Sequence, residues 1–194
     1  MTEPSISLLR ILDASERLFT KRGYNAVTLR DIADEVGIRH TSLYHHVPGG
    51  KEELFIQVTE RHLNRHREGM SQAIANAKAD IRSKLCAVSD WLLSQPPMDL
   101  IRMAYSDMPS IDPKEAFRLS QLGFEALLMP IEGVLHQAHK AQEIQYSPGG
   151  PTAGAFLGMI ESLFAIPEFA LTKSRQKLAY DLIDTWLTGL LPRS

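Results

Sequence analysis

The chain has 194 residues, of which 44% are hydrophobic and 23% are charged, and its formal net charge is -2. This composition excludes a chain that is disordered throughout or collagen-like. No apolar run reaches the roughly 18 residues that a membrane helix needs. The start of the chain lacks a basic segment leading into an apolar core, and the single cysteine, Cys86, excludes an intramolecular disulfide, so we expect a cytoplasmic protein.

The N-terminal 50 residues have the pattern of three helices. Apolar residues recur at three and four positions from Leu8 to Phe19, which predicts a first helix that ends at Gly23. Thr28 is a good N-cap for a second helix, which Gly37 ends. Residues 39–46 predict a third, short helix, because a Pro-Gly-Gly sequence follows it.

The rest of the chain is also helical in its pattern. A long helix is expected over 51–77, and further helices are expected over 79–94, 99–108, 112–142, 152–169 and 174–191, with prolines or glycines between most of them. Pro130 should kink the segment that contains it. No run alternates long enough for a sheet, so the fold class is all-α. We predict a helix-turn-helix domain over 1–50 and a helical effector-binding and dimerisation domain over 51–194, with 51–77 as the connecting helix.

Residues 28–51 carry the most specific signal. Ala33 is small where two helices would cross, Gly37 supplies a left-handed turn four residues later, and Leu43 would plug the core beneath. This is the spacing of a helix-turn-helix, whose second helix enters the major groove of DNA. A short polar helix is often only a solvated face, but together with this spacing it favours DNA binding. Because the net charge is acidic, the basic groups that contact DNA must be placed locally.

The first 60 or so residues resemble the DNA-binding domain of the TetR family of bacterial repressors. The resemblance rests on Phe19, Gly23-Tyr24, Thr28, Asp31-Ile32-Ala33, Val36-Gly37-Ile38, Ser42-Leu43-Tyr44, His46 and Lys51-Glu52-Glu53-Leu54. Two features depart from the usual pattern: Val47 stands in place of Phe, and two glycines precede Lys51 where the family usually has one residue. A branch of the family has a similar Pro-Gly-Gly-Lys turn.

The resemblance implies roles for particular residues. Thr28 and Lys51 match phosphate contacts at helix N-termini, where free N–H groups and the helix dipole favour an anion. Arg39 is the best candidate for reading a guanine, because its fork pairs with O6 and N7. The predicted DNA-binding set is Thr28, Arg39, His40, Thr41, Ser42, Tyr44, His45, His46 and Lys51.

The resemblance also implies a homodimer and a small-molecule effector. Two helices near the C-terminus would pair with their copies, and the predicted interface is Phe156, Leu157, Ile160, Phe164, Leu182 and Trp186. Methionine and aromatic residues gather around helix breaks in the middle of the chain, where cavities between helices tend to form, although plain core packing also explains most of them. The predicted effector pocket, for an apolar or amphipathic ligand, is His62, Trp91, Met103, Met108, Phe117, Phe124 and Met129.

Two other classes of function stay open at this point. An all-helical enzyme would need a catalytic constellation, and Ser110, Asp112 and His136 lack the G-x-S-x-G context of a strained nucleophile. A helical dimer that binds only protein partners would show no salt-dependent affinity for DNA. Pairs such as His62 and His66 lack the acidic or cysteine ligands that complete a metal site, so we expect no metal, no cofactor and no enzymatic activity.

Overall fold

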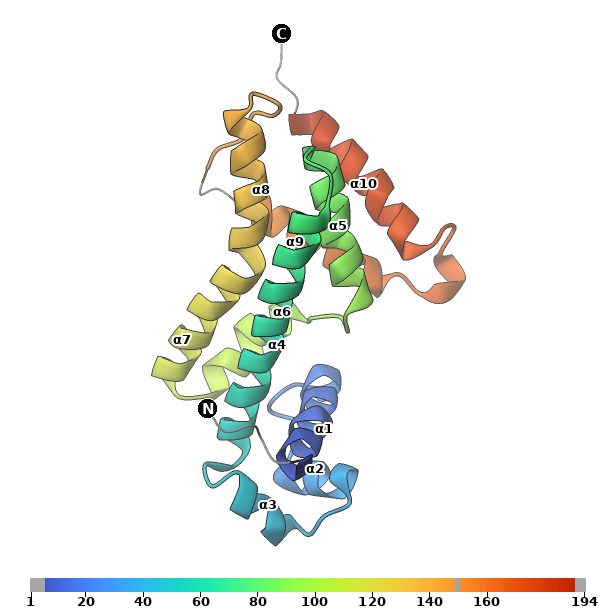
Figure 1. Ribbon diagram of the computed structural model, residues 1–194. Coiled ribbons are helices and arrows are strands. Elements are labelled where there is room, and N and C mark those ends of the chain that lie inside the picture. Colours follow the sequence, from blue (N-terminus) through green and yellow to red (C-terminus); the bar gives the residue numbers. More distant parts are fainter. Residues whose placement is uncertain (1–5, 149–150, 191–194) are drawn as a thin grey trace. The chain divides into compact units, whose positions relative to one another are not determined.

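The computed structural model describes residues 6–148 and 151–190, and within these ranges the chain forms helices and no strand (Figure 1). The all-α fold class predicted from the sequence is therefore confirmed. The α-helices are α1 (Ile6–Arg22), α2 (Leu29–Val36), α3 (His40–His46), α4 (Gly50–Asn76), α5 (Ile81–Ser94), α6 (Leu100–Arg102), α7 (Pro113–Gly123), α8 (Met129–Lys140), α9 (Thr152–Ser162) and α10 (Arg175–Leu190).

The chain divides into two compact units. Unit 1 contains residues 1–62 and 98–122, and unit 2 contains residues 63–97 and 123–194. The predicted boundary between residues 1–50 and residues 51–194 stays a prediction. Segment 98–122 belongs to unit 1 because Met108, Ile111 and Leu119 are buried in the same hydrophobic core as the N-terminal helices.

The core of unit 1 ties the helix-turn-helix to the start of α4. Three aromatic rings lie at its centre: the Phe19 and Phe55 centroids are 5.3 Å apart in a T-shaped arrangement, and the Tyr24 and Phe55 centroids are 4.9 Å apart. Edge-to-face and tilted aromatic pairs of this kind stabilise a core by more than the burial of their apolar surface accounts for. Leu43 of α3 is 1% exposed and packs into the same core, so α3 is fixed to the rest of the unit.

Two π turns interrupt the helical segments, and each lies directly before a Met-Pro pair. The turn η1 (Met103–Asp107) precedes the 3-10 turn η2 (Met108–Ser110), and the turn η3 (Phe124–Leu128) precedes α8. The prolines are Pro109 and Pro130. A proline inside a helix lacks the N–H and its ring crowds the carbonyl four residues earlier, and widening the turn before it relieves that crowding. The sequence predicts a kink at Pro130, and the structure places a π turn there.

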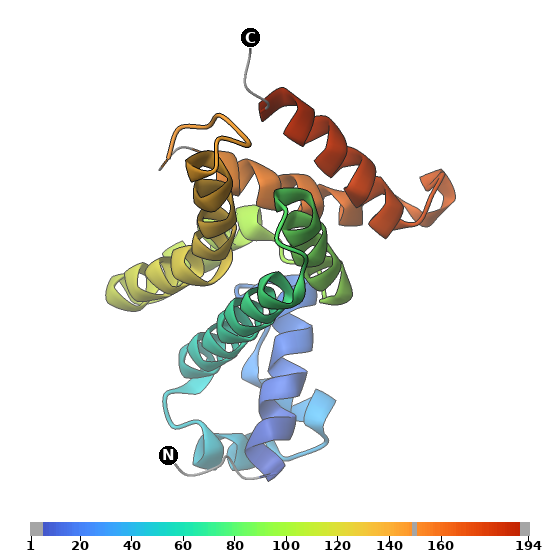
Figure 2. The same ribbon diagram turned by 45° about the horizontal axis from the view of Figure 1, so that its top comes forward.

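Unit 2 is built around α5, which contacts α8, α9 and α10 (Figure 2). Arg82 of α5 forms two hydrogen bonds with Asp184 of α10, at 2.5 and 2.9 Å, and the Tyr180 hydroxyl donates to Asp90 at 2.7 Å. Burial and the hydrogen bond to the Asp90 carboxylate raise the pKa of Tyr180 to about 12. These polar contacts join α5 to α10 outside a core that includes Leu85, Phe156 and Ile183.

The helix predicted over 152–169 ends earlier, at Ser162. It continues only as the 3-10 turns η4 (Leu163–Ala165) and η5 (Glu168–Ala170). Pro167 accounts for the difference, because a residue before proline is pushed out of the helical region, and Ile166 has an extended ψ of 118°. Arg175 then donates to the Leu163 and Ile166 carbonyls at 3.1 and 2.9 Å, which satisfies acceptors that the ended helix leaves open.

The contact of Gly69 in α4 with Trp91 in α5 gives a test of this packing. A Cβ at Gly69 would lie 2.0 Å from the indole ring, so Gly69→Ala is expected to destabilise the protein by about 1–3 kcal/mol. The measurement is urea unfolding. The matched control is Gly133→Ala in α8, where a Cβ meets nothing within 4 Å and helix propensity should stabilise by about 1 kcal/mol. If the two substitutions changed the free energy of unfolding equally, the close approach of Gly69 to the Trp91 ring would be contradicted.

Candidate nucleic-acid interface

Helices α2 and α3 form the predicted helix-turn-helix. The Thr28 hydroxyl accepts from the Asp31 N–H at 3.1 Å and the Asp31 carboxylate accepts from the Thr28 N–H at 2.8 Å, which is the capping box expected from the sequence. Gly37 has a φ of 78°, and the N–H groups of Gly37 and Ile38 both donate to the Ala33 carbonyl. This left-handed cap turns the chain toward α3.

Helix α3 has one apolar side and one hydrogen-bonding side. Leu43 and the following Val47 are each 1% exposed, and they anchor the apolar side in the core. The other side is open to solvent, with exposed residues His40, Thr41, Tyr44 and His45 and half-buried residues Ser42 and His46. The rings of His40 and Tyr44 meet edge to face, with centroids 5.3 Å apart. Such a surface can donate to and accept from base edges and phosphates.

Arg39 occupies the N-cap position of α3, one residue before the helix begins. Its backbone is extended, with φ -68° and ψ 138°, and its side chain makes no capping bond. The residue is exposed, and within residues 6–148 and 151–190 its guanidinium has no ion-pair partner. A guanidinium at the entrance of the second helix keeps all five donors for a ligand.

Thr28 is at the N-terminus of α2, as predicted, but its own donors are already used. The hydroxyl donates to the Asp31 carboxylate at 2.6 Å, and the backbone N–H donates to the same oxygen. A phosphate at this helix end would therefore meet the N–H groups of the first turn of α2, or it would have to displace Asp31 from Thr28.

Lys51 lies in the first turn of α4, and Tyr24 holds its ammonium group. The Lys51 Nζ donates to the Tyr24 carbonyl oxygen at 3.1 Å and lies 4.1 Å from the centroid of the Tyr24 ring. Gly50, with φ 71°, makes the left-handed turn that places this residue at the start of the helix. Burial, with a smaller effect from the Glu52 carboxylate, raises the pKa of Tyr24, so the ring under the ammonium stays a neutral phenol.

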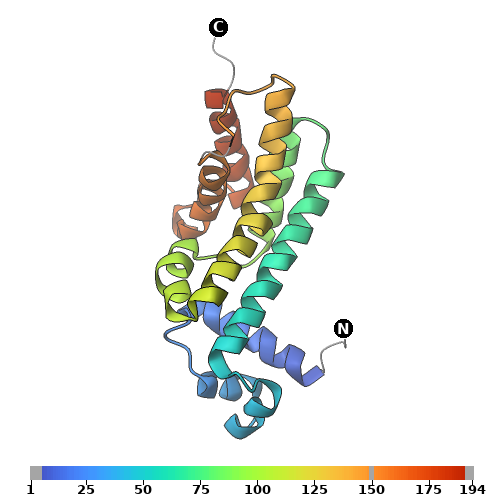
Figure 3. The same ribbon diagram turned by 90° about the vertical axis from the view of Figure 1, so that its left-hand side faces the viewer.

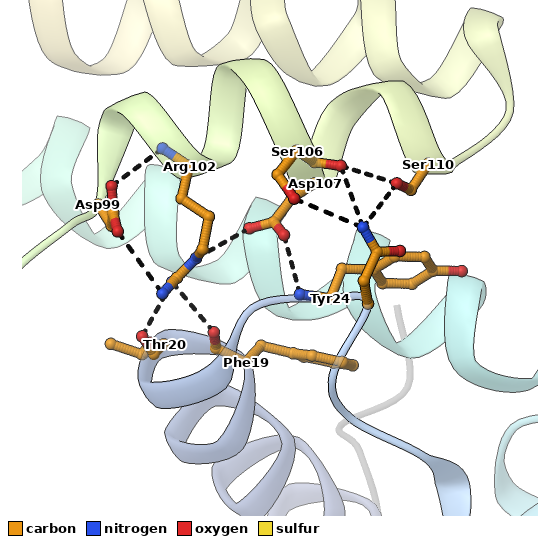
Figure 4. A network of polar contacts seen from close by, with 9 residues as sticks. Phe19, Thr20, Tyr24, Asp99, Arg102, Ser106, Asp107 and Ser110 are labelled. Carbon is orange, nitrogen blue, oxygen red and sulfur yellow. Dashed lines mark hydrogen bonds and ion pairs between the residues drawn. The ribbon is translucent and has the colours of Figure 1, made fainter.

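The end of α1 and the residues after it are held by the segment around η1 (Figure 4). The Arg102 Nη2 donates to the Phe19 and Thr20 carbonyls at 3.2 and 2.9 Å. The Asp107 carboxylate accepts from the Tyr24 N–H at 2.9 Å and is 4% exposed. A cation at a helix C-terminus satisfies open carbonyls and complements the helix dipole.

Comparison with known proteins assigns the helix-turn-helix region. Residues 11–58 match the family model described as bacterial regulatory proteins, tetR family. The transcriptional regulator LmrA of Bacillus subtilis is 42% identical over 67 residues, which is 34% of each chain. The transcriptional activator FasR of Mycolicibacterium smegmatis is 35% identical over 78 residues, which is 40% of this chain and 35% of that one. The helix-turn-helix region of the chain, residues 11–58, is therefore similar in sequence to the TetR family.

Sequence similarity to these curated relatives spans only about a third of their length. The likeness to solved structures extends over most of the chain and concerns the fold alone. The structure of AibR in complex with isovaleryl coenzyme A and operator DNA matches with a TM-score of 0.74, over 92% of this chain and 97% of that one, at 17% identity. A helix-turn-helix followed by further helices is therefore the architecture of this chain.

The residues predicted to line an effector pocket fall into three groups. Met108 is buried in the core of unit 1, and Met103 packs against that core. His62 is 7% exposed, with its Nδ1 at 3.2 Å from the Glu16 carboxylate, and half-buried Trp91 packs on α4. The other three side chains are exposed in this single chain: Phe117, Phe124 and Met129. The pocket stays a prediction, and core packing accounts for Met108.

The residues predicted for the dimer interface also divide. Phe156, Leu157 and Ile160 of α9 are at most 3% exposed, so the chain's own helices leave them almost no surface for a partner. Their place is in the core of unit 2, because Phe156 stacks on Trp186 with centroids 5.5 Å apart. The half-buried residues Phe164, Leu182 and Trp186 can still contribute area. The dimer interface stays a prediction, and within the chain Phe156, Leu157 and Ile160 pack in the core of unit 2.

Other features expected of the chain are placed as follows. Within the described residues no group of three or more His, Cys, Asp or Glu side chains could hold a metal ion. In the same part of the chain no helix has both the length and the apolar character to cross a membrane.

The site predicted from the sequence did not include Tyr24, Arg102 and Asp107. Gly23-Tyr24 belongs to the family pattern, but its contacts with Lys51 and Asp107 join residues 27 and 83 positions apart, and no local spacing indicates them.

The capping box of α2 gives a pH test. Hydrogen bonds from the Thr28 hydroxyl and N–H, with a smaller effect from Arg22, lower the pKa of Asp31 below its ordinary 3.8. Its contribution to stability is therefore fully present above pH 3.8 and is lost as the pH falls through the lower, folded value. The difference in unfolding free energy between wild type and Asp31→Asn should be larger at neutral pH than in acid. Chemical unfolding across this range measures it.

The control for this titration is the same comparison in a Thr28→Val background. Valine keeps the shape of threonine but removes the hydroxyl that lowers the pKa of Asp31, so the pH-dependent part of the difference should shrink. A difference that is constant from neutral pH to acid would show that the carboxylate does not act through this hydrogen bond.

Proposed function

We propose that this chain is a DNA-binding transcription regulator that acts as a homodimer on a near-palindromic operator and is released by a small-molecule effector. The observation that carries the proposal is the exposed face of α3, on a helix whose other side is anchored in the core. At its N-terminus stands Arg39, which has no ion pair with any residue that the structure describes. A recognition helix needs this combination, because base contacts are made by side chains that the protein's own interactions have not already used.

The proposal assigns different tasks to different residues. Arg39 would read a base, most favourably a guanine through O6 and N7, and His40 and Thr41 would contact neighbouring base edges. Tyr44, His46 and Lys51 would contact phosphates and set the position of α3 on the duplex. Since few of these groups are cationic, affinity should decline only modestly with salt.

The exposed face of α9 supports the proposed dimer. Its small residues Gly154, Ala155, Gly158 and Ser162 are exposed, and a Cβ at either glycine would meet nothing within 4 Å. A face of this kind allows a second helix to approach closely, and half-buried Leu182 and Trp186 of α10 add apolar area within the same unit. A two-fold dimer would place two recognition helices about 34–36 Å apart, one DNA turn.

Helix α4 supports control by an effector. It is one helix of 27 residues, which makes it about 40 Å long. Figure 3 shows its ribbon running without a break. Its first turn carries Lys51, and its second half carries His66 and Met70, which are at most 1% exposed. An apolar or amphipathic ligand among the C-terminal helices would shift this helix and so change the spacing of the recognition helices. It can do so only if it binds one arrangement more tightly than the other.

We propose repression as the direction of control, because occupancy of an operator is enough to block a promoter, whereas activation needs a further surface for the polymerase. The name of FasR shows that a relative of this chain is an activator. Expression of a reporter from the chain's own upstream region decides between the two. Repression predicts higher expression when the chain is deleted, and lower expression would reverse the direction.

Substitution of Arg39 tests the reading helix. Arg39→Ala should weaken binding to a duplex selected by the wild type from a random pool by about 1–3 kcal/mol and relax the preference at one base pair. Arg39→Lys is the matched control: it keeps the charge but loses the bidentate fork, so the salt dependence should stay while the preference is lost. The measurement is fluorescence anisotropy across salt concentrations. Selective binding that survives both substitutions would remove Arg39 from the interface.

Substitution of Gly158 tests the dimer. Gly158→Glu places a charge on the exposed face of α9 and should convert the dimer to a monomer in sedimentation velocity, with loss of operator affinity. Gly133→Glu on α8 is the control, because a Cβ there also meets open space, and it should leave the dimer intact. A wild-type chain that is monomeric at micromolar concentration, or a dimer unaffected by Gly158→Glu, would contradict this interface.

A further inference from the structure

We propose that Asp107 is a positioning residue for DNA binding: through Tyr24 it holds the Lys51 ammonium in place for a phosphate. The inference rests on the proposed function, and it extends the DNA-binding machinery to a residue of segment 98–122, far from the helix-turn-helix in sequence. Three contacts make the connection: Asp107 with the Tyr24 N–H, the Tyr24 carbonyl with Lys51, and the Tyr24 ring with the same ammonium.

The first step is the placement of Asp107 beside Arg102. In an α-helix, residues five apart point about 140° away from each other, because each turn takes 3.6 residues. The π turn over Met103–Asp107 bonds residues five apart, with the Met108 N–H donating to the Met103 carbonyl, and so brings such residues toward one face. Arg102 Nε consequently lies 3.5 Å from the Asp107 carboxylate, and both side chains reach the end of α1.

The second step is the fixing of Tyr24. The Asp107 carboxylate is 4% exposed, and a buried charge of this kind needs both a counter-charge and hydrogen-bond donors. Arg102 supplies the charge, and the Tyr24 N–H supplies a donor at 2.9 Å. The fit is close, because a Cβ on Gly23 would lie 3.0 Å from Arg102 Cδ and 3.2 Å from Asp107 Oδ1. The peptide between Gly23 and Tyr24 therefore has little freedom to move.

The third step is the orientation of Lys51. A lysine side chain loses much rotamer entropy when it is ordered, so an ammonium held in advance binds a phosphate at lower cost. The Tyr24 carbonyl accepts one of its three N–H donors, and the ring lies under the charge. The remaining donors and the N–H groups at the start of α4 can meet the anion. Without Asp107, the Gly23–Tyr24 peptide would be released, and the Tyr24 backbone and ring that hold the ammonium would lose this anchor.

A double-mutant cycle between Asp107 and Lys51 tests the inference. The probe is a duplex selected from a random pool by the wild type, with affinity measured between about 50 and 200 mM salt. Lys51→Ala should weaken binding about tenfold and reduce the salt slope by about 0.9. Asp107→Ala should weaken it about threefold to tenfold in the wild-type background, but less than about twofold in the Lys51→Ala background. If the double variant loses affinity by the product of the two single losses, Asp107 does not act through Lys51 and the proposal is overturned.

Three further variants separate positioning from a general effect on folding. Asp107→Asn keeps an acceptor for the Tyr24 N–H and should retain most of the affinity. Ser110→Ala, which removes the 2.9 Å contact of Asn25 with the same segment but leaves Tyr24 untouched, should bind like the wild type. Circular dichroism and thermal unfolding verify each fold, and Asp107→Ser, too short to reach Tyr24, replaces Asp107→Ala if that variant does not fold.

A readout without DNA keeps this inference separate from the proposed function. Nitrogen-15 NMR of the lysine ammonium groups in the free protein should show slowed hydrogen exchange for Lys51, and the slow signal should disappear in the Asp107 variant. A Lys51 signal that is the same with and without Asp107 would overturn the positioning role. If the wild type selects no duplex at all, the proposed function fails, and this NMR comparison still decides whether Asp107 orders Lys51.

Discussion

The end of α1 is the constraint on which the DNA-binding unit depends. A helix that stops inside a folded unit leaves carbonyl groups without partners, and here Arg102 meets two of them while Asp107 takes the N–H of the residue that follows the turn. Because Tyr24 stacks with Phe19 and Phe55, closing this helix end also fixes the aromatic centre of the core. The orientation of α3 follows, since Leu43 is anchored in the same core.

Two prolines determine how the later helical segments are shaped. Pro109 and Pro130 each follow a methionine that closes a π turn, and the wider turn is the local answer to a missing N–H and a crowded carbonyl. The π turn before Pro109 also brings Arg102 and Asp107 to one side of the segment. A feature that disrupts a regular helix thus supplies the contact that holds the helix-turn-helix.

The same helix takes part in both proposed tasks of the chain. The first half of α4 packs in unit 1 through Leu54, Phe55 and Val58, and its second half is buried in unit 2 through Leu63 and Met70. A continuous helix transmits displacement better than a loop, because its backbone hydrogen bonds resist bending. Lys51 at its start contacts Tyr24, and Tyr24 contacts Asp107, so the proposed phosphate contact would be joined to both α4 and segment 98–122.

The sequence by itself determined the helix-turn-helix of this protein and its similarity to the TetR family over residues 11–58. The capping box at Thr28, the left-handed turn at Gly37 and the spacing to Leu43 are local signals, and local backbone physics is enough to predict the helix-turn-helix from them. Only the tertiary structure decided that Phe156 and Ile160 fill the chain's own core, because an amphipathic pattern marks a buried face without naming what covers it. It also decided that Asp107 reaches Tyr24, since a contact across 83 residues depends on packing that no local pattern encodes.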